Sequence, residues 1–325
     1  ANLKGSSALR VQAVSFSALE VCLHLSCEGF CLRMSRKAII ISGIAAGGAV
    51  IALSLNSLWR RNARRKAKKL AVNGSSSIYL IRHGESTVNA RGKQYREQGD
   101  SWPGRAYHEA DFFDAPLTED GQEGATKEVQ FRLQENIREN AGGHIRRLVV
   151  TSTLHRALET AAFGVLPLFP ADQQTEWIAL ESVREATTCE IRSKDGIDVP
   201  TEVSSEKPCN MRKALVHARK SFPYVNFSHC TEEDPLPRVE TVEMVDKRVA
   251  EFVDWIGMWV DQQQEDHGDV CVDVILVSHY VFLHRLMSKI ESETGVSMEP
   301  RGLKNCEVRV LPLSCILQLA GTSNY

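Results

Sequence analysis

The sequence lacks the short motifs by which several large enzyme classes are recognised. It contains no GxxxxGK[ST] phosphate loop, no GxGxxG fingerprint, no HExxH zinc pair, no GxSxG nucleophile elbow and no EF-hand loop. These absences argue against P-loop nucleotidases, dinucleotide-dependent dehydrogenases, zinc proteases of that class, α/β-hydrolases and calcium sensors.

The sequence also lacks a disulfide framework, because its nine cysteines form no CxxC pair and no regular spacing. A chain of 325 residues, 43% hydrophobic and 25% charged, can bury enough apolar surface to fold without disulfides. Scattered cysteines are more typical of a reducing compartment than of a secreted scaffold.

Acidic residues are scarce in the first 70 residues, which contain 12 lysines and arginines but only Glu20 and Glu28. The remaining 255 residues contain 27 basic and 39 acidic residues. The net charge of -2 therefore averages a basic leader and an acidic body. An acidic body disfavours a nucleic-acid partner, so we expect none.

Charge is absent from residues 38–59, and a helix of this length spans the roughly 30 Å hydrocarbon core of a bilayer. Three basic residues shortly precede this stretch and seven follow it. We therefore predict a single-pass membrane helix, with residues 38–69 contacting lipid and residues 60–325 on the cytoplasmic side. A buried core helix and a cleaved signal peptide are the alternatives; the basic flanks argue against the first, and a poor cleavage site argues against the second. The organelle stays open.

The chain divides into four predicted segments. Residues 1–37 are a leader whose role stays open; residues 1–33, which precede the first methionine, Met34, are either a targeting peptide or not part of the native protein. Residues 38–59 are the predicted transmembrane helix, and residues 60–76 are a basic juxtamembrane segment and linker. Residues 77–325 are predicted to form the folded domain.

Three short apolar runs in the body predict strands: Ile78–Ile81, Leu148–Thr151 and Val272–Val277. Helical periodicity over Ala125 to Ile137, after a start signal at Thr118, and over Val242 to Trp259 predicts helices between them. Strands that alternate with helices indicate a three-layer α/β/α sandwich with a mostly parallel central sheet.

Two further segments complete the expected organisation of the body. The alternating stretch from Cys306 to Val310 predicts a closing strand. The polar stretch Gln262–Asp269 is interpreted as a loop.

Each predicted strand leads, at its carboxyl end, to side chains that can hold a phosphate. Ile81 is followed by Arg82 and His83, Thr151 precedes Arg156, and Val277 is followed by Ser278 and His279. Ligands of open α/β sheets bind beyond the carboxyl ends of the strands, so we expect these side chains to meet at one edge. Arginine forks and helix-start amides are the donors that anions prefer.

These residues resemble the signature of the histidine phosphatase (phosphoglycerate mutase-like) superfamily. Leu80-Ile81-Arg82-His83-Gly84-Glu85-Ser86, followed by Asn89, carries the resemblance, which extends over about residues 77–313. Further matching segments, in chain order, are Asp114-Ala115-Pro116-Leu117-Thr118, the stretch from Ser152 to Ala161, Val183-Arg184-Glu185 and Val277-Ser278-His279. Asn305-Cys306-Glu307 is most similar to the plant, algal and fungal phosphoglycerate mutase-like branch.

The resemblance implies a role for each site residue. His83 would be the nucleophile that takes the phosphoryl group, Glu185 would protonate the leaving oxygen, and His279 would stabilise the equatorial oxygens together with the arginines. The phosphate-binding residues would be Arg82, Arg156 and Asn89. Phosphoryl transfer is catalysed mainly by positioning and charge stabilisation, so we expect neither a metal ion nor an organic cofactor.

Several positions depart from the family pattern. Tyr280 and Val281 stand where the family usually has small residues, which would narrow the site, and residues 94–113 would cover it without resembling a true mutase. Glu181 and Glu190 are interpreted as solvated surface carboxylates rather than as the acid. The remaining histidines are interpreted as surface or packing residues: His108, His144, His155, His217, His229, His267 and His284.

The sequence therefore predicts hydrolysis of phosphomonoesters through a phosphohistidine on His83, with a small phosphorylated metabolite as substrate. Phosphoglycerate mutase activity is one alternative. A non-catalytic, membrane-anchored module that binds phospho-ligands is the second. The identity of the substrate and the oligomeric state stay open.

Overall fold

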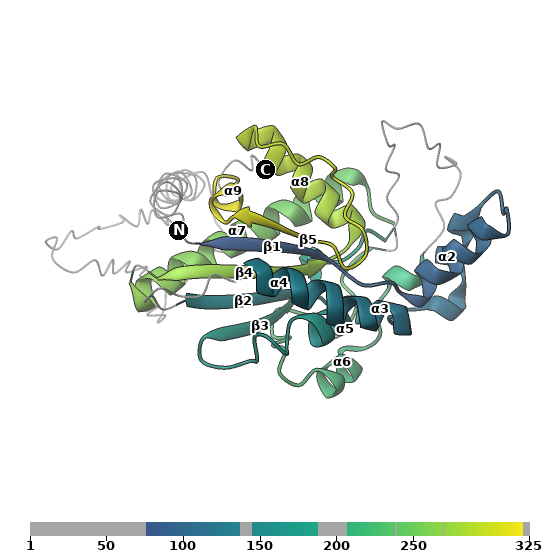
Figure 1. The fold of residues 1–325 in the computed structure, drawn as a ribbon, viewed down its shortest axis with the longest axis horizontal. Helices are drawn as coiled ribbons and strands as arrows, with labels where there is room; N and C mark the ends of the chain where they lie inside the picture. The colour runs from purple at the N-terminus through teal and green to yellow at the C-terminus, as the bar shows by residue number, and fades with distance from the viewer. Residues whose placement is uncertain (1–75, 137–144, 188–206, 238, 269, 321–325) are drawn as a thin grey trace, which may run out of the picture. The chain divides into compact units, whose positions relative to one another are not determined.

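The computed structural model describes residues 76–136, 145–187, 207–237, 239–268 and 270–320 (Figure 1). No helix within these ranges is long and apolar enough to cross a membrane. The predicted span 38–59, the leader before it and nearly all of the linker lie outside the described residues, as do His144 and Glu190.

The core of the described fold is a five-stranded sheet in the order β3-β2-β4-β1-β5. Four strands run parallel, and β5 pairs antiparallel with β1. The strands are β1 (Ser77–Arg82), β2 (Ile145–Ser152), β3 (Thr175–Leu180), β4 (Cys271–Ser278) and β5 (Val308–Pro312). The predicted α/β fold with a mostly parallel sheet is confirmed, whereas β3 was not predicted.

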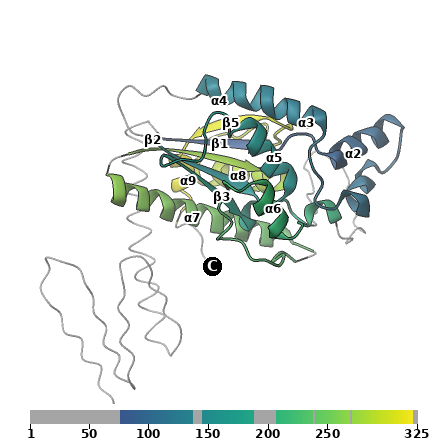
Figure 2. The same cartoon turned by 90° about the horizontal axis from the view of Figure 1, so that it is seen from below.

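Helices cover both faces of the sheet, which explains why β1, β2 and β4 are apolar runs rather than alternating ones. Ile78 and Leu80 pack with residues of α7 and α8, whereas Tyr79 and Ile81 pack on the opposite face with residues of α5. Figure 2 shows the sheet between α4 on one side and α7 on the other. The α-helices are α2 (Thr87–Glu97), α3 (Glu119–Gly124), α4 (Gln130–Asn136), α5 (His155–Gly164), α6 (Leu215–Ser221), α7 (Val242–His267), α8 (Tyr280–Thr294) and α9 (Ser314–Leu317).

The remaining helical segments are short and mostly lie in the connections. They are the 3₁₀ turns η1 (Pro103–His108), η2 (Ala110–Phe112), η4 (Glu181–Val183) and η5 (Pro208–Asn210), and the π-helical segment η3 (Ala125–Val129). The start predicted at Thr118 is confirmed, because its hydroxyl accepts the Gly121 N–H at 3.0 Å and caps α3.

The interpretation of Gln262–Asp269 as a loop was wrong, because His267 is the last residue of α7. Gly268, whose φ is +76°, caps the end of this helix. Glutamine and glutamate are good helix formers, and Gln263 accepts a hydrogen bond from Nε of Arg146 at 3.1 Å. Polar composition here marks the solvated end of a long helix.

Candidate active site

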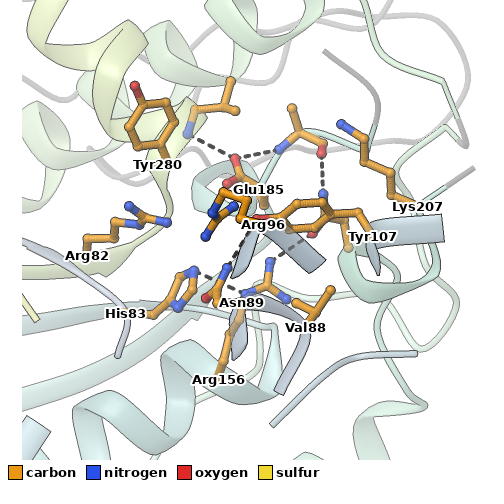
Figure 3. Close-up of a pocket in the computed structure, with 13 residues that line it drawn as sticks. Arg82, His83, Val88, Asn89, Arg96, Tyr107, Arg156, Glu185, Lys207 and Tyr280 are labelled. Atoms are coloured by element: carbon orange, nitrogen blue, oxygen red, sulfur yellow. Dashed lines mark hydrogen bonds between the residues drawn. The ribbon is translucent and has the colours of Figure 1, made fainter. Parts of the chain in front are cut away.

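The six predicted site residues converge at the carboxyl ends of β1, β2 and β4. Five of them line one cavity of about 510 Å³, and the ring of the sixth, His279, lies 4.9 Å from that of His83 between centroids (Figure 3). The full lining is Arg82, His83, Val88, Asn89, Arg96, Tyr107, Arg156, Glu185, Ala186, Lys207, Asn210, Tyr280 and Val281. Their roles stay predictions, but their proximity is a structural fact.

The backbone after β1 is held in place by contacts with the end of β4, with α5 and with α3. The His83 N–H donates to the carbonyl of Ser278 at 3.0 Å, and the Gly84 N–H donates to the hydroxyl of Thr160 at 2.9 Å. A Cβ atom at Gly84 would lie 2.6 Å from the carbonyl oxygen of Gly121, so this position requires glycine. The loop is therefore fixed from three sides.

The ring of His83 is held in one tautomer. Its Nδ1 lies 2.7 Å from the carbonyl oxygen of Gly84, which can only accept, so Nδ1 carries the hydrogen. Nε2 then presents a lone pair, and Nε–H of Arg156 donates to it at 3.2 Å. The atom of His83 in contact with Arg156 is thus an unprotonated nitrogen, which is the nucleophilic form of imidazole.

Burial lowers the pKa of His83 well below its ordinary value of 6.5, and the charges of Arg156 and Arg82 lower it further. The pKa of His279 is lowered well below that value too, first by burial and then by Arg156 and His83. Both imidazoles therefore stay neutral near neutral pH.

These shifts predict that the protein loses stability as the pH falls below 6.5. Above that pH both rings are neutral in the folded and in the unfolded state. Below it, only the unfolded chain takes up the two protons. The free energy of unfolding then falls by about 1.4 kcal/mol per pH unit for each ring, until the lower pKa values of the folded state are reached. Urea unfolding of the full chain between about pH 7.5 and 5.5 measures the slope. The double variant His83→Gln, His279→Gln should show a much shallower fall, and equal slopes in both proteins would contradict the prediction.

Arg156 is buried at the start of α5, and each of its three side-chain nitrogens donates one hydrogen bond. Besides His83, it donates through Nη1 to the carbonyl of Cys209 at 2.6 Å and through Nη2 to Oδ1 of Asn210 at 2.9 Å. The second arginine, Arg82, donates through Nη1 to the carbonyl of Leu303 at 2.8 Å. Both guanidinium groups are therefore oriented before any substrate arrives.

His279 is completely buried, and its two ring nitrogens have different surroundings. Nε2 lies 2.8 Å from the hydroxyl of Ser152, which also accepts the N–H of Leu154 at 3.2 Å. If the hydroxyl donates to Nε2, the ring hydrogen is on Nδ1, which has no partner among the described residues. In that tautomer the Nδ1–H of His279 is an unused donor, in a ring that lies against that of His83.

Asn89 belongs to the first turn of α2 and is positioned by the helix cap. Its Oδ1 accepts the N–H of Ser86 at 3.2 Å and the hydroxyl of Ser86 at 2.8 Å. Its amide nitrogen is left to donate, and one hydrogen reaches the hydroxyl of Tyr107 at 3.3 Å. The cap therefore fixes the amide as a donor that lines the cavity.

Glu185 lies in the loop after η4, and its side chain contacts the first turn of α8. Its Oε1 accepts the N–H of Val281 at 3.1 Å and that of Ala186 at 3.0 Å, whereas Oε2 makes no hydrogen bond to a described residue. Nη1 of Arg248 holds this loop from α7, because it donates to the carbonyl of Arg184 at 2.8 Å. One carboxylate oxygen is therefore anchored and the other is available.

The interpretation of Glu181 as a solvated surface carboxylate was wrong. Its side chain is only 11% exposed and contacts Nη1 of Arg184 at 3.2 Å and Nε of Arg212 at 2.8 Å. Arg184, which is completely buried, also contacts Asp234 at 2.5 Å. Glu181 is thus part of a buried ion-pair network beneath the loop that carries Glu185.

Sequence reasoning missed several residues that line the cavity. Lys207 and Asn210 lie between the matching segments Val183-Arg184-Glu185 and Val277-Ser278-His279, in a stretch that none of the family motifs covers. Arg96 and Tyr107 lie within residues 94–113, which were predicted only as a whole to cover the site. Tyr280 and Val281 line the cavity, as their position after His279 predicted; the Arg82 guanidinium lies 5.1 Å from the centroid of the Tyr280 ring.

No protein-family profile matches the chain. It is 26% identical over 253 residues to a phosphoglycerate mutase-like protein of Arabidopsis thaliana, covering 72% of this chain and 82% of the relative. It is also 26% identical over 270 residues to phosphoglycerate mutase-like protein 2 of the same plant, covering 72% of each. The resemblance to phosphoglycerate mutase-like proteins is confirmed, and the plant relatives agree with the predicted branch.

Solved phosphatase structures are similar to this chain as well. An ecdysone phosphate phosphatase of Bombix mori, solved with tungstate, is 16% identical, with a TM-score of 0.45 over 72% of this chain and 88% of that one. A phosphoserine phosphatase of Entamoeba histolytica, solved with 3-phosphoglyceric acid, is 16% identical, with a TM-score of 0.34 over 72% and 89%.

Proposed function

We propose that the protein hydrolyses phosphomonoesters of small metabolites through a phosphohistidine on His83. The observation that carries this proposal is the His83 ring, whose Nε2 lone pair is held among cationic side chains by the hydrogen bond from Nδ1 to Gly84. A neutral imidazole surrounded by arginines is matched to attack on a dianionic phosphoryl group.

The first step transfers the phosphoryl group to the enzyme. Nε2 of His83 attacks phosphorus, the P–N bond forms as the ester P–O bond breaks, and the leaving oxygen takes a proton from Glu185. Arg156, which donates to Nε2 before the reaction, would donate to a phosphoryl oxygen instead. Arg82, Asn89 and Nδ1 of His279 would supply further donors.

The second step releases phosphate. Glu185, now a carboxylate, takes a proton from water as the water oxygen attacks phosphorus and the P–N bond breaks. Orthophosphate leaves, and both His83 and Glu185 return to their initial protonation states. The cycle balances without an oxidant, a reductant or a second substrate.

Hydrolysis of p-nitrophenyl phosphate by the detergent-solubilised full chain, with a chelator present, tests this proposal. We expect steady release of nitrophenol, and an alkaline quench during turnover of a ³²P-labelled ester should trap acid-labile label on the protein. The exposed His217 lies on α6, outside the cavity, and His217→Ala is the matched control that should keep both signals. Binding of phosphate esters without turnover would overturn the proposal and favour a binding module. Interconversion of the two monophosphoglycerates would favour a mutase.

We also propose that residues 38–59 anchor the domain to a membrane, with residues 60–325 on the cytoplasmic side. The uncharged stretch and its basic flanks support this proposal. Alkaline carbonate extraction of cell membranes should leave the full chain in the pellet, and release of the chain into the supernatant would overturn the anchor.

A further inference from the structure

The backbone around Glu185 is buried but irregular. Residues 182–187, here the Glu185 segment, form no regular structure beyond the end of η4, and Val183, Arg184, Ala186 and Thr187 are buried. Polar backbone groups that are out of water need hydrogen-bond partners, because an unpaired group is costly. In this segment side chains from elsewhere in the chain supply many of them. These side chains therefore decide where the carboxyl group of Glu185 lies.

Arg248 on α7 binds the segment on both sides of Val183. Its Nη1 donates to the carbonyls of Ser182 and Arg184, each at 2.8 Å. Its Nε and Nη2 donate to the two carboxylate oxygens of Glu240 at 2.8 and 2.9 Å. One guanidinium group thus holds the backbone before Glu185 and a carboxylate at the same time.

Glu240 holds the segment on the other side of Glu185. Its Oε2, which accepts from Arg248, also accepts the N–H of Thr187 at 2.9 Å. The side chains of Glu240 and Arg248 are only 1% and 7% exposed. A buried ion pair often contributes no more stability than apolar residues of the same volume. That this pair bonds to three peptide groups around one carboxyl group favours a role in positioning.

The remaining peptide groups of the segment are held in a similar way. The carbonyl of Val183 accepts the hydroxyl of Ser278 at 2.6 Å, and the carbonyl of Ala186 accepts Nδ2 of Asn210 at 2.7 Å. The backbone on each side of Glu185 is therefore fixed, and its carboxyl group cannot move without breaking several of these bonds.

We propose that Arg248 and Glu240 are positioning residues for the proton transfer from Glu185 to the leaving oxygen. This inference rests on the proposed function, because it takes Glu185 to be the proton donor. Glu185 lines the cavity, whereas Arg248 and Glu240 do not, so the pair acts through the backbone of the Glu185 segment (Figure 3). Displacement of a reacting group by about 1 Å is enough to lower a rate by roughly 10²-fold.

Two esters of similar size separate this role from general damage to the fold. p-Nitrophenyl phosphate releases nitrophenolate, which leaves without a proton. Benzyl phosphate releases an alkoxide, which needs the proton of Glu185 as the P–O bond breaks and the P–N bond to His83 forms. For each ester, kcat/KM reports this first transfer and not the later release of phosphate. The readout is the ester ratio, which is kcat/KM for the nitrophenyl ester divided by that for the benzyl ester.

The variant Arg248→Lys keeps the charge opposite Glu240 but cannot bind two carbonyls and a carboxylate together. In the detergent-solubilised full chain we expect it to lower kcat/KM about 30-fold for benzyl phosphate and at most about threefold for p-nitrophenyl phosphate. The ester ratio should therefore rise about tenfold or more. Glu240→Gln has nearly the same shape and should also raise the ratio, and Glu185→Gln sets its upper limit.

Leu133→Ala is the control for loss of stability. Leu133 is buried on α4, across the sheet from α7, and its truncation destabilises the fold by leaving a cavity (Figure 2). This variant should leave the ester ratio unchanged. Equal losses for both esters in Arg248→Lys and Glu240→Gln would overturn the positioning role, as would a similar rise of the ratio in Leu133→Ala.

Amide hydrogen exchange tests the pair without any turnover. Relative to the amides of β4, exchange of the Ala186 and Thr187 N–H groups should become about tenfold faster in Arg248→Lys and should not change in Leu133→Ala. Unchanged exchange in Arg248→Lys would overturn the positioning of the segment. Failure of the wild-type protein to hydrolyse either ester would instead overturn the proposed function, and faster exchange would still support the effect of the pair on the segment.

Discussion

Alanine in place of His83 is expected to lower kcat/KM for p-nitrophenyl phosphate by at least about 10⁴-fold, because the reaction then loses its covalent route. The neighbouring donors cannot replace the ring, since Arg156 and Arg82 are cations and Ser152 has its hydroxyl next to His279. The trapped label should disappear with the activity. Stopped assays with and without enzyme set the limit of detection.

The fold of this variant must be intact for the result to count. The circular dichroism spectrum should match that of the wild-type protein, and the free energy of unfolding from urea titration should fall by at most about 3 kcal/mol, because truncation of a buried ring leaves a cavity but keeps the strand pairing. Hydrolysis that persists within about tenfold of the wild-type rate in a folded His83→Ala protein would exclude His83 as the nucleophile.

The variant Arg184→Met is expected to lower the free energy of unfolding by about 3–5 kcal/mol. The guanidinium of Arg184 is completely buried and donates to Asp234 at 2.5 and 3.0 Å and to the carbonyl of Asn210 at 2.6 Å. Burial acts to raise the pKa of Asp234, but its hydrogen bonds to Arg184 hold that pKa below the ordinary value. Methionine fills a similar volume but leaves Asp234 and Glu181 without this partner.

Urea unfolding at neutral pH measures the loss. Arg132→Met is the matched control, because Arg132 and its partner Glu135 have side chains that are 60% and 43% exposed, and such pairs contribute at most about 1 kcal/mol. Because the ion-pair network supports the loop that carries Glu185, kcat should fall as well. A loss of stability no larger than that of Arg132→Met would show that Arg184 is not a structural cation.

The carboxyl ends of the strands were predictable because apolar runs buried on both faces have a strong sequence signal, and the charged residues that follow them stand out against it. Strand β3 was missed because Thr175 and Glu176 open it with polar side chains, although Trp177 and Ile178 are buried. Burial of the central part outweighs the local pattern at its start.

Contacts between sequence-distant groups explain the other differences. The sequence predicts an exposed glutamate at Glu181 because its closest ion-pair partner, Arg212, is 31 residues away in sequence and bonded to it at 2.8 Å. Asn210 likewise reaches Arg156 from 54 residues away. Pairings of this kind arise only after the sheet has brought the loops together.

The short segment around η5 lines the cavity and also contacts residues that are proposed to act in the reaction. Lys207 lines the cavity, and the next few residues supply the Cys209 carbonyl and the Asn210 amide oxygen that orient Arg156. The amide nitrogen of Asn210 also donates to the carbonyl of Ala186, beside Glu185, at 2.7 Å. Changes to this segment that accept a new metabolite would therefore disturb two groups at once. These are Arg156, which is proposed to hold the phosphoryl group, and Glu185, the proposed proton donor. Selectivity and turnover are expected to change jointly in any laboratory evolution that targets these four residues.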